Sequence, residues 1–262
     1  MKRIVLPFIT LLFFACDQVD PADRYIAIDN ATPGGQEPTE AVETRRVLIE
    51  EFTGQRCVNC PNAAAEIQRL KQAYGADTVI AVSIHGGELA FYSTAKLLGL
   101  RTELGDEYNK RWNVAAWPKG MVNRSGLLSD YEEWFTLVNS AVKQEAPLRL
   151  SVEATTSAIT TTAEALKPVQ GKLQLWVTES GITAMQAMPD GTNNREYTHN
   201  HVLRTAVNGA WGEDITLAQG QTETFTHTVA LDPAWNSGSL SVVAFVYNDS
   251  EGLLQVVETA VK

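Results

Sequence analysis

The spacing of apolar residues changes near Pro147, and this change constrains the fold more than any other feature of the chain. Upstream of it, β-type runs at 47–52 and 78–84 enclose a stretch of helix formers at 61–74, which is the order of a βαβ unit. Downstream the helical period disappears. Short β-rich stretches separated by turn signals follow at 148–156, 172–178, 223–230, 240–247 and 253–261. We therefore predict an α/β domain over residues 46–146 and an all-β, immunoglobulin-like sandwich over residues 147–262.

The first fifteen residues are predicted to be an export signal and not part of the fold. Two basic residues precede an apolar run at 4–14, which is about half of the roughly 20 residues that a membrane-spanning helix needs. The run ends in Phe14-Ala15-Cys16, which resembles the lipobox of bacterial lipoproteins and implies that Cys16 is lipidated and anchors the mature chain to a membrane. The alternative is an ordinary secretory signal with a chance cysteine, and in both cases the protein is exported. Residues 16–45 are predicted to be a flexible linker.

The charge of the chain excludes one class of partner. It carries 31 acidic against 21 basic residues, a formal net charge of −10, which is the wrong sign for binding the phosphate backbone of nucleic acids. A metal site has weak support, since His199 and His201 can point the same way from a strand but no third ligand is evident, and Arg204 is expected to pair with an acid. We predict neither a metal nor a cofactor.

The motif Cys57-Val58-Asn59-Cys60 lies directly after a predicted strand and at the predicted start of a helix. Unpaired N–H groups and the positive end of the helix dipole stabilise a thiolate there, and the thiolate is the nucleophile in disulfide exchange. We expect Cys57, beside Arg56, to be the more exposed sulfur and the attacker, and Cys60 to resolve the mixed disulfide. A zinc site is disfavoured because no second cysteine pair exists. A static disulfide that only stabilises the fold is the alternative.

The order of strand, CxxC, helix and strand resembles the thioredoxin fold, and a proline further along adds to the resemblance. Trp117-Pro118 precedes a strand predicted near Gly120, where thioredoxins carry a cis-proline that faces the dithiol. The resemblance implies that Cys57 is the nucleophile, Cys60 the resolving thiol and Pro118 the proline of the substrate loop.

Three smaller expectations complete the first domain. Glu50 and Glu51 lie near the place where thioredoxins carry a buried acid that assists proton transfer, and because side chains alternate along a strand, one of the two is expected to face solvent. Helix formers occupy 91–111, interrupted by glycines. A capping box at Ser129 opens a helix predicted to end near Gln144.

Several features of the chain together are similar to a known family. The export signal, the acidic linker, the CxxC motif, Tyr-Thr-His-Asn-His-Val-Leu-Arg at 197–204 and Val-Val-Ala-Phe-Val-Tyr-Asn-Asp at 242–249 resemble the 28-kDa outer-membrane-protein-related family of anaerobic Gram-negative bacteria. The resemblance implies a lipoprotein of the cell envelope, located at the outer membrane. Two functions then compete. A lipid-anchored thiol–disulfide oxidoreductase would act on envelope protein clients, whereas a non-catalytic surface receptor or adhesin would bind surface ligands and keep Cys57 and Cys60 in a structural disulfide.

Overall fold

The computed structural model describes residues 42–262; the predicted export signal, Cys16 and most of the predicted linker lie outside the described residues. The helices are α1 (Cys60–Tyr74), α2 (Glu103–Arg111) and α3 (Trp134–Ala141), with short 3-10 turns η2 (Tyr131–Glu133) and η3 (Ser237–Ser239). The strands are β1 (Val47–Thr53), β2 (Val79–His85), β3 (Lys119–Val122), β4 (Leu148–Ala154), β5 (Ala158–Ala165), β6 (Val169–Glu179), β7 (Ile182–Ala187), β8 (Asn193–His199), β9 (Val202–Ala206), β10 (Glu213–Leu217), β11 (Thr222–Thr228), β12 (Leu240–Asn248) and β13 (Gly252–Ala260). Among residues 42–262, no helix has the length and apolar character needed to cross a bilayer.

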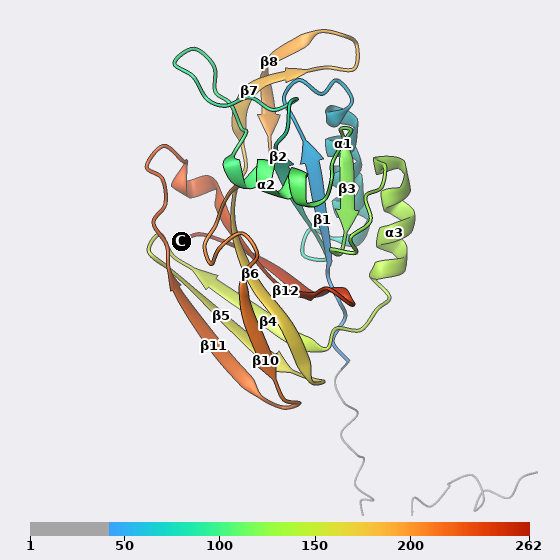
Figure 1. Cartoon of the computed structure of the whole chain (residues 1–262), viewed down its shortest axis with the longest axis vertical. Helices are drawn as coiled ribbons and strands as arrows, with labels where there is room; N and C mark the ends of the chain where they lie inside the picture. Colours follow the sequence, from blue (N-terminus) through green and yellow to red (C-terminus); the bar gives the residue numbers. More distant parts are fainter. Residues whose placement is uncertain (1–41) are drawn as a thin grey trace, which may run out of the picture. The chain divides into compact units, whose positions relative to one another are not determined.

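An eight-stranded sheet runs in the order β13-β12-β6-β9-β2-β1-β3, with β10 paired to β6 beside this path. β1 and β2 are parallel, as the strand–helix–strand order predicts, with Val47 opposite Val79. β9 joins β2 in parallel through Ser83 and Val202, and the other pairs of this sheet are antiparallel. The three-stranded sheet β11-β5-β4 and the hairpin β7-β8 are separate from it (Figure 1).

The predicted fold class, an α/β thioredoxin-like domain followed by an immunoglobulin-like sandwich, is wrong. Residues 42–262 are mostly β, with 44% strand and 17% helix, and their sheets are mixed and antiparallel. Strands from the C-terminal half continue the sheet that β1 and β2 begin. The physical reason is that β2 is buried along its whole length and needs a partner on each edge, and β9 pairs with the edge that β1 leaves open. The apolar pattern shows that a strand is buried on both faces, but not which strand pairs with it.

Side chains alternate across β1, and both faces of this strand are covered. Ile49 faces a core beneath α1 and α3, whereas Leu48 faces the opposite core, to which α2 and strands of the C-terminal half contribute. All seven residues of β1 are buried as a result. Glu50 and Glu51 are therefore both buried, and the expectation that one of them faces solvent is wrong.

Arg124, just after β3, ties the two halves of the chain together. Its Nε donates to Glu50 Oε1 at 3.2 Å, and both side chains are at most 1% exposed. Aromatic rings contributed by both halves surround the guanidinium carbon at 4.2 to 5.8 Å, and they belong to Tyr108, Trp176, Trp211, Phe245 and Tyr247. The carboxylate and the ring faces together offset the removal of this cation from water.

Candidate functional site

Cys57 and Cys60 form a disulfide where the chain passes from β1 into α1. The helix begins at Cys60, has Pro61 in its first turn, and has no side-chain cap at Asn59. β1 and α1 therefore lie where the sequence predicts a strand and a helix, with the CxxC motif at their junction. Cys57 is 2% exposed and Cys60 is 3% exposed, so the expectation that Cys57 is the more exposed of the two is wrong.

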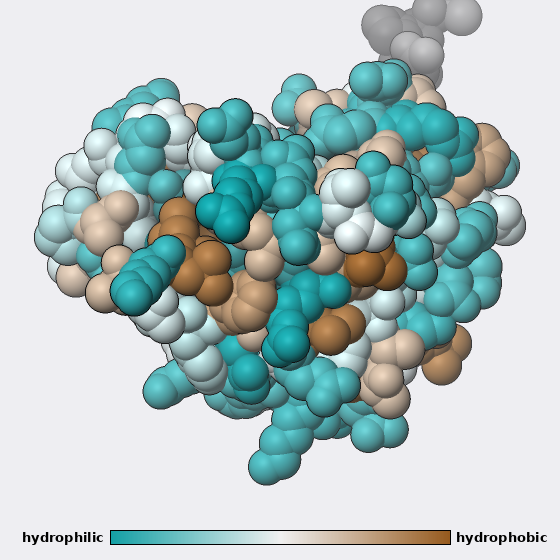
Figure 2. Space-filling model, turned by 90° about the horizontal axis from the view of Figure 1, so that it is seen from above, coloured by the Kyte–Doolittle hydropathy of each residue, from teal (hydrophilic) through white to brown (hydrophobic). Residues whose placement is uncertain are grey.

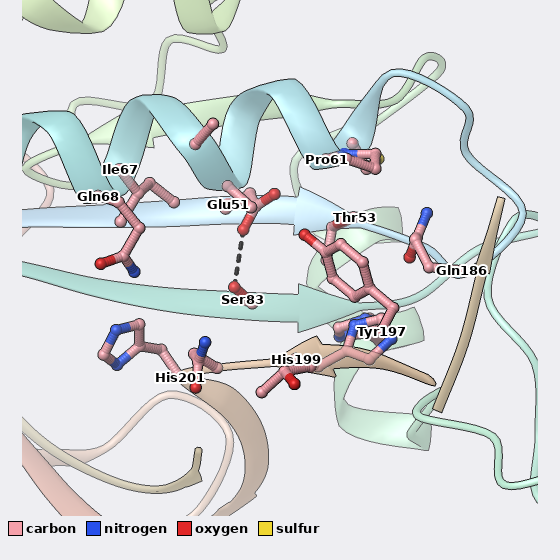
Figure 3. A pocket seen from close by; sticks show the side chains of 16 residues that line it. Glu51, Thr53, Pro61, Ile67, Gln68, Ser83, Gln186, Tyr197, His199 and His201 are labelled. Atoms are coloured by element: carbon pink, nitrogen blue, oxygen red, sulfur yellow. Dashed lines mark hydrogen bonds between the residues drawn. The ribbon is translucent and has the colours of Figure 1, made fainter. Parts of the chain in front are cut away.

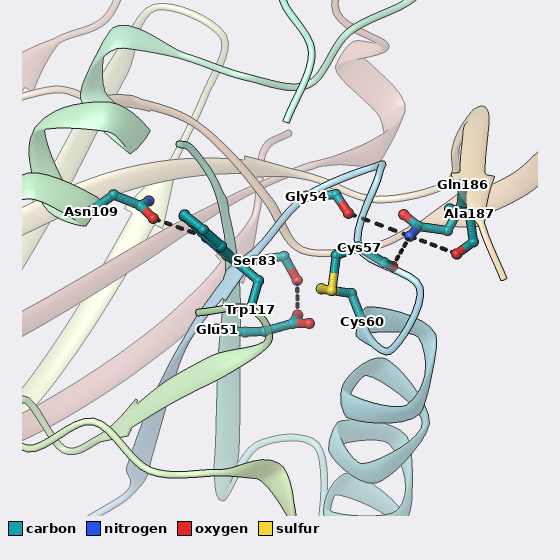
Figure 4. Close-up of a disulfide and its surroundings, with 9 residues drawn as sticks. All are labelled: Glu51, Gly54, Cys57, Cys60, Ser83, Asn109, Trp117, Gln186 and Ala187. Atoms are coloured by element: carbon teal, nitrogen blue, oxygen red, sulfur yellow. Dashed lines mark hydrogen bonds between the residues drawn. A yellow bond between two sulfur atoms is a disulfide. The ribbon is translucent and has the colours of Figure 1, made fainter. Parts of the chain in front are cut away.

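The hairpin β7-β8 is hydrogen-bonded to the backbone of the cysteine loop. The side-chain Nε2 of Gln186 donates to the carbonyl of Cys57 at 2.9 Å (Figure 4). The backbone N–H of Ala187 donates to the carbonyl of Gln55 at 2.8 Å. Gln55 in turn donates to the carbonyl of Met185 at 3.2 Å. The backbone of the cysteine loop is thus bonded to a segment about half the chain away. No local sequence signal indicates such a contact.

The peptide bond between Trp117 and Pro118 is cis, and it directly precedes β3. Pro118 lines a groove together with Asn59, so the predicted substrate-loop proline lies on the Asn59 side of the cysteine loop. The indole of Trp117 donates to Asn109 Oδ1 at 3.0 Å and packs against Gly87, where a Cβ atom would collide with the ring. The structure therefore brings Pro118 and the CxxC loop together at one groove.

A pocket of about 210 Å³ lies beside Cys60, between α1 and the end of β8 with the residues that follow it (Figure 3). Figure 3 shows Ile67 and Gln68 of α1 on one side of this pocket and Tyr197, His199 and His201 on the other. Cys60 is one of the residues that line it; Cys57, among the described residues, is not. The pocket thus reaches one of the two cysteines.

Glu51 contributes a carboxyl group to this pocket, on the face of β1 away from Arg124. Ser83 donates its hydroxyl to Glu51 Oε2 at 2.7 Å. Burial raises the pKa of Glu51 to about 7, against the smaller lowering effect of hydrogen bonds from Ser83 and Thr53. The pocket therefore holds an acid that is poised between its protonated and ionised forms at neutral pH.

Three histidines line the same pocket. Burial lowers the pKa of His85 to about 3 and that of His199 to about 4, and the two rings meet edge to face with their centroids 5.5 Å apart. The Ser83 backbone faces the His85 ring, but neither ring nitrogen of His85, nor Nε2 of His199, makes a hydrogen bond of good geometry. His201 Nε2 lies 3.1 Å from Lys71 Nζ, and burial, with Lys71 adding to it, lowers the pKa of His201 to about 4. All three imidazoles are neutral at pH 7.

The described residues offer no set of side chains that could hold a metal ion. Within residues 42–262, no group of three or more histidine, cysteine, aspartate or glutamate side chains is placed to hold a metal ion. Arg204 pairs with Glu179 at 3.3 Å, which confirms the expected pairing with an acid.

Sequence reasoning missed His85, Ser83 and Gln186. His85 could have been singled out from the sequence, because a histidine at the end of an apolar strand lies at the edge of the core, where such residues often line sites.

Known proteins were compared with this chain by sequence and by structure. Residues 105–262, more than half of the chain, match the family model described as Outer membrane protein Omp28. Among solved structures, HBP35 of Porphyromonas gingivalis has a TM-score of 0.65 at 16% identity, covering 84% of this chain and 76% of that one. A protein from Agrobacterium tumefaciens has a TM-score of 0.52 at 15% identity, covering 83% of this chain and 94% of that one.

Two further findings complete the comparison. A domain of the outer membrane lipoprotein Omp28 from Porphyromonas gingivalis is 22% identical over 45% of this chain and 89% of its own length. Its TM-score of 0.28 is too low to show a shared fold. No curated protein matches. The structural neighbours show the fold alone, whereas the family match confirms the family and the outer membrane location expected from the sequence. The chain belongs to the Omp28 family of outer membrane proteins.

Proposed function

We propose that this outer membrane protein carries out thiol–disulfide exchange in the cell envelope, with Cys57 and Cys60 as the redox pair. One observation carries the proposal: the disulfide lies at the start of α1, and the buried carboxyl of Glu51 lines the pocket that reaches Cys60. In this proposal, lipid on Cys16 holds the protein at the membrane and Pro118 lies beside an extended client.

Two features of the site support this chemistry. The disulfide lies at the N-terminus of α1, where the positive end of the helix dipole stabilises a thiolate released from the disulfide. The pKa of Glu51, raised to about 7, allows its carboxyl to accept and return a proton at neutral pH, where a carboxyl with an ordinary pKa is a poor acid.

The reduction potential of the Cys57–Cys60 pair tests the proposal. A value between about −270 and −120 mV, with turnover in an insulin reduction assay, would match known catalysts of exchange. A value below about −300 mV without turnover would contradict the proposal. The Cys60→Ser variant should capture disulfide-bonded envelope clients as mixed disulfides, because the Cys57 thiolate attacks the client disulfide and no second cysteine resolves the product, and the variant that also carries Cys57→Ser should capture none.

A second candidate function is a non-catalytic surface receptor or adhesin in which the disulfide is structural. The burial of both cysteines and the Gln186 bond to Cys57 favour it. Replacing both cysteines by alanine would then lower the free energy of unfolding by about 2 kcal/mol, the loop-entropy value for so short a loop, and leave ligand binding unchanged. Binding assays need the whole of residues 42–262, because the large sheet joins both halves.

A further inference from the structure

The two cysteines differ in what covers them. Cys57, whose carbonyl accepts from Gln186, does not line the pocket, whereas Cys60 lines it beside Glu51. Figure 4 shows the disulfide with Gln186 on one side and Glu51 on the other. A small molecule that enters the pocket therefore reaches Cys60 and not Cys57.

Buried polar atoms in the pocket lack partners. His85 is 2% exposed with both ring nitrogens unpaired, and His199 is 5% exposed with Nε2 unpaired. Because both imidazoles are neutral at pH 7, each ring has one donor nitrogen and one acceptor nitrogen. Buried polar atoms in native proteins are normally hydrogen-bonded, so these nitrogens point to a bound polar molecule.

The volume of the pocket suits a small molecule. At about 30 Å³ for each water, its 210 Å³ corresponds to about seven waters, which leaves room for a molecule as small as free cysteine. The face of the molecule seen in Figure 2 is largely hydrophilic, with a few apolar side chains among the polar ones.

Polar groups that line the pocket favour an amino-acid head group over a plain alkyl thiol. Glu51 offers a carboxylate in its ionised form, and the neutral rings of His85 and His199 offer N–H donors. An amino acid carries both an ammonium and a carboxylate, so the ammonium finds an ionic partner and the carboxylate finds donors. A plain alkyl thiol makes neither contact.

We propose that the pocket binds a low-molecular-weight thiol with an amino-acid head group, of the size of cysteine, which exchanges with the disulfide at Cys60 Sγ. This inference rests on the proposed function and names the substrate class and the sulfur that is attacked.

The exchange balances with two molecules of the thiol. Glu51 in its ionised form takes the proton of the first thiol, whose thiolate bonds to Cys60 Sγ while the bond to Cys57 Sγ breaks and Cys57 leaves as a thiolate at the start of α1. The thiolate of a second molecule attacks the sulfur of the first, which forms the small disulfide and releases Cys60. The two protons pass to the two cysteines, so the protein disulfide is reduced and two small thiols are oxidised.

Reduction of the whole protein by cysteine tests the proposal, with alkylation and mass spectrometry to count free thiols over time. The rate should saturate with cysteine concentration, and S-methylcysteine, which cannot react, should inhibit it competitively. Mercaptoethanol, which lacks the head group, should reduce the protein with a rate that rises linearly. A linear dependence on cysteine, without inhibition by S-methylcysteine, would overturn the inference.

Matched variants locate the reaction in the pocket. Ala64 lines the pocket from α1, and Ala73 lies exposed on the same helix, outside it. Ala64→Phe should slow reduction by cysteine at least tenfold, whereas Ala73→Phe should change it less than twofold. In the same way, His199→Phe should raise the cysteine concentration needed for half-saturation at least tenfold, and His227→Phe, on β11, should leave it unchanged.

Circular dichroism and thermal unfolding identify any variant that fails to fold, and S-methylcysteine inhibition of the wild type then still decides. Equal rates for folded Ala64→Phe and Ala73→Phe would overturn the inference while leaving the proposed function intact. A disulfide that no thiol reduces would instead contradict the proposed function itself, and the two failures are therefore distinguishable.

Discussion

Replacing Glu51 by glutamine should flatten the pH dependence of stability. Burial raises the pKa of this carboxyl from 4.5 to about 7. Each pH unit by which folding displaces a pKa is worth about 1.4 kcal/mol, so ionising Glu51 in the folded protein costs about 3 kcal/mol more than in the unfolded chain. Because the folded state holds this proton more tightly, the free energy of unfolding falls by that amount as the pH rises from about 4.5 to about 7, and it stays low above that range.

Urea unfolding of wild type and Glu51→Gln, from about pH 4 to about pH 8, measures the effect. Glutamine keeps the shape of the side chain and an oxygen that accepts the Ser83 hydroxyl. The stability of the wild type relative to the variant should therefore drop by about 3 kcal/mol across this range. The buried histidines titrate in both proteins, so their contribution cancels in the difference.

The matched control is Glu223→Gln, the same substitution at an exposed position of β11. The free energy of unfolding of Glu223→Gln should follow that of the wild type at every pH, because the Glu223 side chain is exposed to water in the folded protein as well as in the unfolded chain. If Glu51→Gln also ran parallel to the wild type, burial would not be the force that displaces the Glu51 titration, and its assignment as the proton acceptor of the site would be refuted.

Three further substitutions test the packing that holds the site in place. Arg124→Met leaves Glu50 buried without its partner and should lower the free energy of unfolding by about 3–5 kcal/mol in urea, while adding Glu50→Leu should recover much of it; a loss below about 1 kcal/mol would show that the pair is dispensable. Trp176→Ala empties a fully buried site and should cost about 3–5 kcal/mol, a prediction that an unchanged urea midpoint would contradict. Gly120→Ala places a Cβ atom against the Trp134 ring and should cost about 1–3 kcal/mol, or about 2–4 °C of Tm for each kcal/mol; an equal Tm would show that the ring can move aside.

The elements that local sequence determines are those that the sequence predicts well. β1, α1 and β2 lie where the apolar runs, the proline at the helix start and the glycine after Tyr74 place them. The helix expected from the capping box at Ser129 is present in shorter form, as η2 followed by α3. Of the residues 91–111, only the last turns are helical, because Gly99 sits so close to the backbone of Phe91 and its neighbours that the segment folds as a packed loop.

Features that depend on distant pairing could not be predicted. The buried face of β5 carries small or polar side chains after Ile159, at Thr161, Ala163 and Ala165, which is too little apolar surface to give a clear strand signal. β9 meets β2 through one residue pair, Ser83 with Val202, which no periodicity indicates. The same limit applies to the site: the cysteine motif and the proline are evident in the sequence, but one wall of the pocket, at 197–201, comes from the C-terminal half.

The bond from Gln186 to Cys57 links two residues that are 129 positions apart, and this separation has a consequence for how the protein matures. Cys57 and Cys60 are synthesised and exported before Gln186, so they are accessible to oxidants and to other thiols until the hairpin β7-β8 has formed. When β7-β8 later forms its hydrogen bonds to the cysteine loop, both cysteines are buried. The sulfurs are therefore more accessible to solvent in an incomplete or unfolded chain than in the folded protein.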